Sequence, residues 1–197
     1  MKTFQATVTS PQLVIEHDDS PESPREWDNV GYFITAERNH GCPDNNQELE
    51  EIVRETQHSA TNTESHMALV KSEVETELKE KVLYIAPVYR HEHGNVIYRR
   101  GTAEGFDVSN CGFYIVTDKT YKDFPADIKH VEHNIDAELA MYTNWCNGEV
   151  YRFTLLDEDG EYVDGCGGFY DIEDIRERLP EEWKEEPLEQ YVVWLKN

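Results

Sequence analysis

Two histidines separated by a single residue are the clearest candidate ligands in this sequence. His91 and His93 lie within Tyr89–Asn95, and in a strand, side chains two residues apart point to the same face. Imidazole nitrogens and carboxylates bind divalent metal ions, which activate water for hydrolysis. Asp28 and Asp107 are the carboxylates that would complete such a set. The pattern allows a metal-dependent enzyme of the hydrolase or nuclease type, and a hydrogen-bonded histidine pair at the surface is the structural alternative.

Residues 17–29 combine one histidine with five carboxylates. Oxygen ligands at this density suit Mg²⁺ or Ca²⁺, although both ions also need a fixed coordination geometry. In the structural alternative, Arg25 pairs with Glu22 or Asp28, and Trp27 anchors the loop in the core. A third interpretation is an acidic patch that faces a partner protein. The five carboxylates belong to Asp18, Asp19, Glu22, Glu26 and Asp28.

No complete catalytic signature accompanies these residues. The sequence contains no P-loop, GxGxxG, GxSxG or HExxH motif. Its four cysteines (Cys42, Cys111, Cys146 and Cys166) form no CxxC pair, so we expect reduced thiols. Neither Cys111 nor Cys166 has a basic neighbour in sequence to activate it as a nucleophile. We therefore expect no cofactor in a binding protein, and a Mg²⁺ or Ca²⁺ ion in the enzymatic alternative.

The charge of the chain restricts its partners. Forty-one acidic residues stand against 18 basic ones, which gives a formal net charge of -23 on 197 residues. Such a field repels nucleic acid and anionic membranes, and it favours cationic partners. We therefore expect a partner protein with a basic surface, no direct contact with nucleic acid and no association with a membrane. Solubility or adaptation to salt is the alternative explanation of the acid excess.

The elements that must position these residues alternate between strands and helices. β-Branched and aromatic stretches predict strands over 3–16, 31–35, 82–90, 95–100, 112–117, 149–156 and 161–169. Apolar residues at helical spacing predict helices over 47–58 and 64–81. We predict an α+β fold with a mostly antiparallel sheet covered on one side by helices. Residues 1–197 would form a single domain, with an acidic helical insertion at about 47–81.

Glycines and one proline define the connections between these elements. Gly148 is expected to end the helix of 134–145. Asp159 and Gly160 predict the turn of a β-hairpin, which explains the acidic run around them better than a calcium loop does. Pro87 predicts that its strand lies at an edge or contains a bulge.

Three stretches of the sequence carry a family resemblance. Glu22–Gly31 is similar to an SPREWDN-x-G opening, Tyr89–Val116 to Y-x-H-x-G followed by W-D-S-G-x-x-G-F, and Gly148–Tyr170 to a GEVYGF…DSCWGFYG hairpin. In this order they resemble an uncharacterised family of small acidic proteins from bacteriophages and mobile elements. The resemblance implies a viral accessory protein in the host cytoplasm, without a particular activity. The chain departs from the family pattern at Phe106, Gly165 and Gly167.

These features together favour a binding protein over an enzyme. Carboxylates on a rigid surface can imitate the phosphates of DNA, whose charges lie about 1.7 Å apart along the duplex axis. We expect an antagonist of a host nucleic-acid-binding or defence protein that acts by DNA mimicry, with fast, salt-sensitive association. Residues 17–29, the helices of 47–80 and residues 171–189 would supply the acidic face. The residues expected to contact the partner are Asp18, Asp19, Glu22, Glu26, Asp28, Glu173, Asp174, Glu181 and Glu182.

Overall fold

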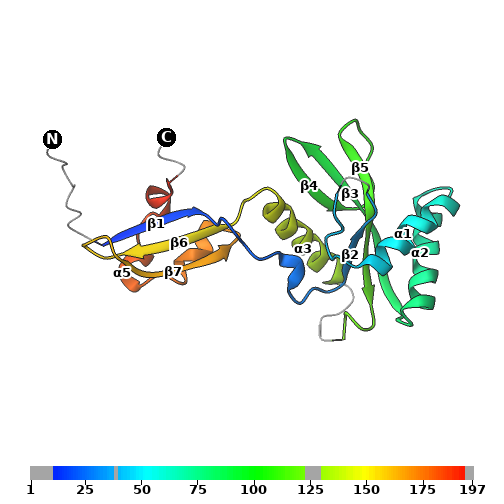
Figure 1. The fold of residues 1–197 in the computed structure, drawn as a ribbon, viewed down its shortest axis with the longest axis horizontal. Helices are drawn as coiled ribbons and strands as arrows, with labels where there is room; N and C mark the ends of the chain where they lie inside the picture. The colour runs from blue at the N-terminus through cyan, green and yellow to red at the C-terminus, as the bar shows by residue number, and fades with distance from the viewer. Residues whose placement is uncertain (1–10, 38–39, 123–129, 194–197) are drawn as a thin grey trace. The chain divides into compact units, whose positions relative to one another are not determined.

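The computed structural model describes residues 11–37, 40–122 and 130–193, and it confirms an α+β protein with antiparallel sheets. Its contacts group the chain into two compact units, each with its own sheet (Figure 1). The central unit spans Ser23–Thr143, and the terminal unit combines the residues up to Glu22 with those from Asn144 onward. The expectation of a single domain stays a prediction. No helix within the described ranges is long and apolar enough to cross a membrane.

The central unit is organised around a four-stranded antiparallel sheet with the order β2-β5-β3-β4. Neighbouring residues of a strand point to opposite faces. Ile34 and Phe113 therefore share one face, whereas Phe33 and Tyr114 share the other, and all four are buried. The strands are β2 (Tyr32–Thr35), β3 (Val82–His93), β4 (Asn95–Arg100) and β5 (Val108–Thr117).

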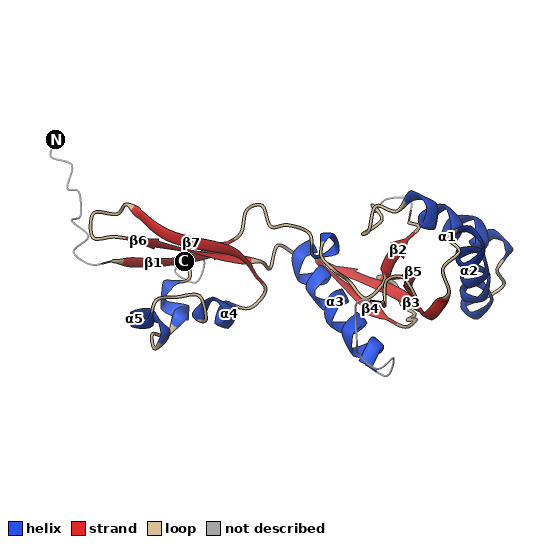
Figure 2. Ribbon diagram, turned by 90° about the horizontal axis from the view of Figure 1, so that it is seen from below, coloured by secondary structure: helices blue, strands red, loops and turns tan. Residues whose placement is uncertain are grey.

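Helices lie against both faces of this sheet, as Figure 2 shows. On one face, Leu49 of α1 and Val74 of α2 belong to the same core cluster as Ile34. On the other face, the ring of Tyr142 in α3 lies 5.5 Å from the ring of Phe33. The predicted one-sided cover is thus corrected for this unit, because α3 buries its own apolar residues on the second face. The helices are α1 (Gln47–Ser59), α2 (Thr63–Glu77) and α3 (Val131–Cys146).

A buried arginine joins distant segments of the central unit. The guanidinium of Arg25, whose side chain is 3% exposed, donates to Asp44 at 2.6 and 3.1 Å, to Glu138 at 2.9 Å and to the Gly31 carbonyl at 2.8 Å. Tyr114 donates its hydroxyl to the same Glu138 carboxylate. Burial disfavours the charged guanidinium, but the hydrogen bond to Asp44 and the neighbouring charges outweigh it, so the pKa of Arg25 is raised.

Two other carboxylates that are largely or fully buried in this unit also have cationic partners. Glu37 accepts a hydrogen bond from Arg90 at 2.6 Å. Glu80 accepts from Lys119 at 3.0 Å and from the Thr117 hydroxyl at 2.7 Å. An ionised carboxylate is costly to bury unless it is paired and hydrogen-bonded. The few basic residues of the chain are therefore used in part to neutralise acids in its interior.

The terminal unit is a three-stranded antiparallel sheet with the order β1-β6-β7. Ile15 and Phe153 of the sheet share a buried cluster with Ile175 and Leu188 from the short helices. These helices lie against one face of the sheet (Figure 2). The elements are β1 (Gln12–His17), β6 (Tyr151–Leu156), β7 (Tyr162–Phe169), α4 (Ile172–Arg176), α5 (Glu181–Lys184) and the 3₁₀ turn η3 (Leu188–Tyr191).

Most element predictions are confirmed where the structure describes the chain. The helices of 47–58 and 64–81 correspond to α1 and α2, although α2 ends at Glu77. Gly148 and Gly160 adopt φ angles of 72° and 82°, as a helix end and a hairpin turn require. Pro87 is bonded on both sides, because it pairs with Phe113 of β5 and its carbonyl accepts from the Gly101 amide at 2.7 Å. The register shift between Val88 and Tyr89 is the bulge that Pro87 predicted as one of two alternatives. The predicted strand of 3–16 is confirmed only for β1, because residues 1–10 lie outside the described ranges.

Two expectations for the 17–29 loop are wrong. The ion-pair partners of Arg25 are Asp44 and Glu138, which lie 19 and 113 residues away, rather than Glu22 or Asp28. Trp27 is 41% exposed and does not anchor the loop in the core. The buried residue of the turn η1 (Pro24–Glu26) is Pro24.

Removal of the Arg25 side chain should destabilise the protein strongly. Arg25→Ala leaves two largely buried carboxylates without their cation, which typically costs roughly 3–5 kcal/mol. Arg54→Ala removes only an exposed helical partner of Glu50 and should cost less than about 1 kcal/mol. Urea unfolding followed by circular dichroism measures both values. Equal stabilities for the two variants would contradict the role assigned to Arg25.

Candidate partner-binding surfaces

A groove between α1 and α2 gathers acidic side chains on the central unit. It has a volume of about 550 Å³, and its apolar floor includes Ile52 and Leu69. Five glutamates line it, with no lysine or arginine among the described lining residues. A cationic group placed here would meet several carboxylates at once, so the groove suits a basic partner. The glutamates are Glu48, Glu51, Glu55, Glu73 and Glu77.

The two helices hold these glutamates on a fixed scaffold. The Asn46 side chain caps α1 by accepting from the Leu49 amide at 3.1 Å, and Asn62 caps α2 in a reciprocal capping box. His66 of α2 then links the helices, because its Nε2 lies 2.9 Å from the Val53 carbonyl oxygen of α1. Side chains three or four residues apart on a helix lie about 5–6 Å apart. The groove therefore presents its carboxylates at set intervals.

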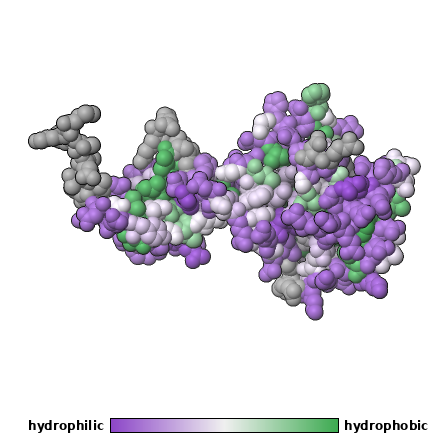
Figure 3. Space-filling view, viewed as in Figure 1, coloured by the Kyte–Doolittle hydropathy of each residue, from purple (hydrophilic) through white to green (hydrophobic). Residues whose placement is uncertain are grey.

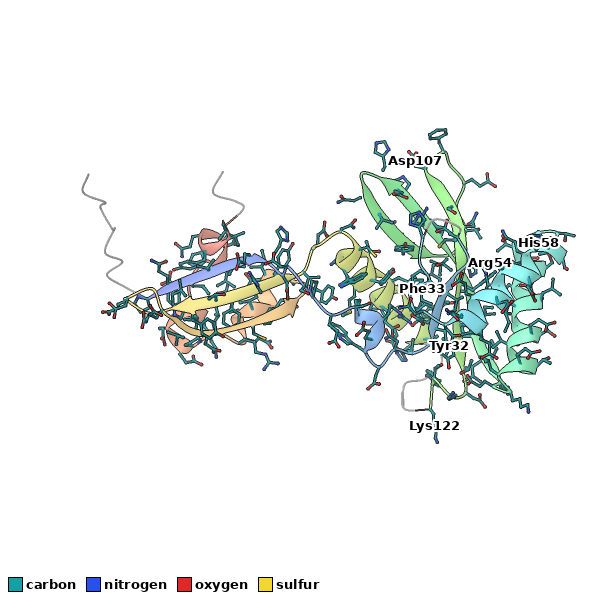
Figure 4. The ribbon with its side chains drawn as sticks, in the orientation of Figure 1. Tyr32, Phe33, Arg54, His58, Asp107 and Lys122 are labelled. Carbon is teal, nitrogen blue, oxygen red and sulfur yellow. The ribbon has the colours of Figure 1, made fainter. Side chains whose placement is uncertain are left out.

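The basic residues of α1 belong to a different surface. Arg54 and His58, labelled in Figure 4, line a separate hollow with Glu37 and His40. Arg54 pairs there with Glu50, so among the described lining residues the groove receives no cationic side chain from α1. The sequence predicted that the helices of 47–80 belong to the acidic face, but it did not single out any of their glutamates as a contact residue. The i, i+3 and i, i+4 spacing of the glutamates is the signal that would have identified them.

Seven of the nine residues predicted to contact a partner lie in the terminal unit. Several are engaged within that unit. Asp18 accepts from the Gly168 amide at 3.1 Å, and Asp19 pairs with Arg152 at 3.1 Å. These two side chains thus help to hold a loop against the sheet. The seven residues are Asp18, Asp19, Glu22, Glu173, Asp174, Glu181 and Glu182.

The acidic residues on the short helices of this unit are exposed, and two of them form ion pairs. Glu173 pairs with Arg176 at 2.8 Å, and this hydrogen bond lowers the pKa of Glu173. Glu181 pairs with Lys184 at 2.6 Å. Asp174 and Glu182 are exposed. The acidic surface of the terminal unit is therefore more extensively paired than the groove between α1 and α2.

Glu26 and Asp28, the other two predicted contacts, lie in the central unit. Both are exposed in and after η1. The loop that carries them is fixed from within by Asn29, whose amide donates to the carbonyls of Pro24 and Trp27 at 3.1 and 2.6 Å. The two carboxylates therefore project from an ordered loop.

Of the predicted metal ligands, the structure pairs only His93 with Asp107. His93 Nδ1 lies 3.1 Å from Asp107 Oδ2 at the end of the central sheet, where Figure 4 labels Asp107. His91 is half-buried two residues earlier on β3, and Asp28 belongs to the loop after η1. Within the described ranges, no group of three or more His, Cys, Asp or Glu side chains is arranged to hold a metal ion.

Cys111 lines a hollow that His66 and Phe113 also line, and it is poorly suited to nucleophilic chemistry. It is buried on β5, where burial and the charge of Glu37 raise the pKa of its thiol to about 12. Burial also raises the pKa of Cys42. Cys146 and Cys166 are exposed. All four are free thiols, as the sequence predicted.

The chain matches no family model, no curated protein and no solved structure among those compared.

The four thiols should separate into two classes on alkylation. At pH 8 a thiol with a pKa of about 12 is ionised to roughly one part in ten thousand, and Cys111 and Cys42 are also shielded from reagent. Brief treatment of the native protein with iodoacetamide should label Cys146 and Cys166 only, as read by peptide mass spectrometry. Labelling in urea should reach all four. Rapid labelling of native Cys111 would contradict its burial.

Proposed function

We propose that this protein binds the basic, nucleic-acid-binding surface of another protein and blocks it by imitating the charge of DNA. The target would be a host nucleic-acid-binding or defence protein, and the setting would be that of a bacteriophage or mobile-element protein in the host cytoplasm. The acidic groove between α1 and α2 is the observation that carries the proposal.

The groove supports this proposal because its described lining residues include no lysine or arginine. A surface whose acids are already paired gains little from a basic partner, because it must give up existing interactions. The five glutamates of the groove have no lysine or arginine among their described neighbours in it. A partner's lysines and arginines would relieve the repulsion between these carboxylates, and the apolar floor would add area to bury.

The capped helices support imitation of DNA rather than diffuse attraction. Duplex DNA presents its phosphates at regular intervals on a stiff rod. The α1 helix rises about 1.5 Å per residue, and Glu48, Glu51 and Glu55 recur along it at nearly one turn each. A mimic of this kind tolerates single substitutions and weakens gradually as charge is removed. No specific observation favours the metal-dependent enzyme, which stays an alternative prediction.

The proposal is tested by capture from a bacterial lysate on the immobilised protein. We expect nucleic-acid-binding proteins to be retained at low salt and to be released by high salt or by competing duplex DNA. Mass spectrometry identifies the retained proteins. Retention that is indifferent to both salt and DNA would contradict the proposal.

Two variants with the same net charge test whether binding depends on the groove glutamates or only on the net charge of the chain. Replacement of the five groove glutamates by glutamine should weaken the captured partner's affinity by at least about tenfold. The matched control removes five exposed charges elsewhere and should retain most of the affinity. Equal losses in the two variants would show that net charge, not the groove, determines binding. The control substitutions are Glu104→Gln, Glu158→Gln, Asp159→Asn, Glu161→Gln and Glu177→Gln.

A further inference from the structure

A second groove lies in the terminal unit, beside the edge of β1 that faces away from β6. Its volume is about 740 Å³, and its walls combine aromatic and aliphatic side chains with two carboxylates. Figure 3 shows apolar residues gathered over β1 on this unit. Leu13 and Val14 point to opposite faces of the sheet, yet both line the groove, so it follows the edge of the strand. The other lining residues are Pro11, Gln12, Glu182, Trp183, Glu186, Tyr191 and Val193.

The edge of β1 retains capacity to pair with another strand. One side of β1 pairs with β6 along all six residues without a register shift. On the other side, the described residues supply one isolated bridge, from Ile15 to Val192. Gln12–Val14, before that bridge, contains no charged residue and no proline. Natural sheets normally protect such edges with charges, prolines or bulges.

The opposite edge of the same sheet is protected in this way. β7 pairs with β6 through two register shifts, and Gly168 within it has a φ of 85°. These irregularities bend the strand and interrupt its row of backbone donors and acceptors. The contrast makes β1 the edge of this sheet that can accept an added strand.

The side chains of the groove indicate what such a strand would carry. Trp183 and Tyr191 pack edge-to-face with ring centroids 5.3 Å apart, and Val193 is 47% exposed beside them. These side chains offer apolar contact to alternate residues of an extended peptide. Glu182 and Glu186 lie on the same wall, so Lys or Arg at the remaining positions complements their charge, and the aromatic rings favour cations as well.

We propose that this groove binds an extended peptide segment of a partner protein, with alternating apolar and basic residues, that adds as a strand to the Gln12–Val14 edge of β1. The proposal goes beyond the binding of a folded basic surface by the central unit. Backbone hydrogen bonds to β1 supply affinity, and the aromatic wall with its two glutamates supplies selectivity.

Selection from a phage-displayed library of random linear peptides on the full-length protein tests this directly. We expect the enriched sequences to alternate apolar and basic residues. Each selected peptide is then synthesised twice, with N-methyl groups on its odd or on its even amides. Because alternate amides of a strand face its neighbour, one methylated form should lose binding and the other should keep it.

Variants of the protein locate the bound peptide. Trp183→Ala should weaken binding by at least about tenfold. Val193→Lys, at a position that is 47% exposed, should do the same by repelling a basic peptide, and circular dichroism checks that the variant is folded. Tyr162→Ala, which truncates a 66% exposed aromatic on β7, is the matched control and should leave the affinity unchanged, as should the five groove substitutions in the central unit.

Four results would overturn the proposal. The first is enrichment of no peptides, or of neutral or acidic ones. The second is equal binding by both N-methylated forms, which would mean that backbone pairing is not used. The third is undiminished affinity in Val193→Lys. The fourth is a tenfold gain on removal of residues 1–9, which would mean that the chain's own N-terminal residues occupy the groove. Each of these leaves the test of the central groove unaffected.

Discussion

The pairing of largely buried carboxylates is the constraint on which the described structure depends. A chain with 41 acidic and only 18 basic residues must fold without leaving an anion alone in its interior. The central unit meets this requirement with Arg25 between Asp44 and Glu138, and with Arg90 beside Glu37. Arg25 in particular joins segments that are far apart in sequence. Its loss would remove the hydrogen bonds that link η1 to Asp44 and to Glu138 of α3.

The use of cations inside the fold has a consequence at the surface. Because arginines are committed to buried acids and to ion pairs such as Arg152 with Asp19, the groove between α1 and α2 keeps its glutamates without a described cation. Like charges at helical spacing are destabilising by a few tenths of a kcal/mol per pair. The apolar contacts of both helices with the core keep the helices side by side despite this repulsion. A basic partner would remove it, which links the stability of the unit to its proposed binding.

Local elements could be predicted from the sequence, whereas the partners of individual side chains could not. Helical spacing identified α1 and α2, and Gly148 and Gly160 marked a helix end and a turn. Nothing local assigns Arg25 to Glu138, 113 residues away, because that pairing requires α3 to pack on the sheet. The acidic groove exists because α1 and α2 pack side by side. The outer edge of β1 exists because β1 is the first strand in the order β1-β6-β7. Neither arrangement can be read from local sequence. His93 and Asp107 were both among the predicted metal ligands. They lie close together because the end of β3 is next to the start of β5.

The most direct test of the central claim is displacement of a fluorescently labelled DNA duplex from the captured partner, followed by anisotropy. The protein should displace the duplex completely at stoichiometric concentration, and the variant lacking the five groove glutamates should need at least about tenfold more. Apparent affinity should also fall as salt rises. Simultaneous binding of the duplex and this protein to the same partner would contradict the claim, because a mimic and the DNA it imitates must compete for one surface.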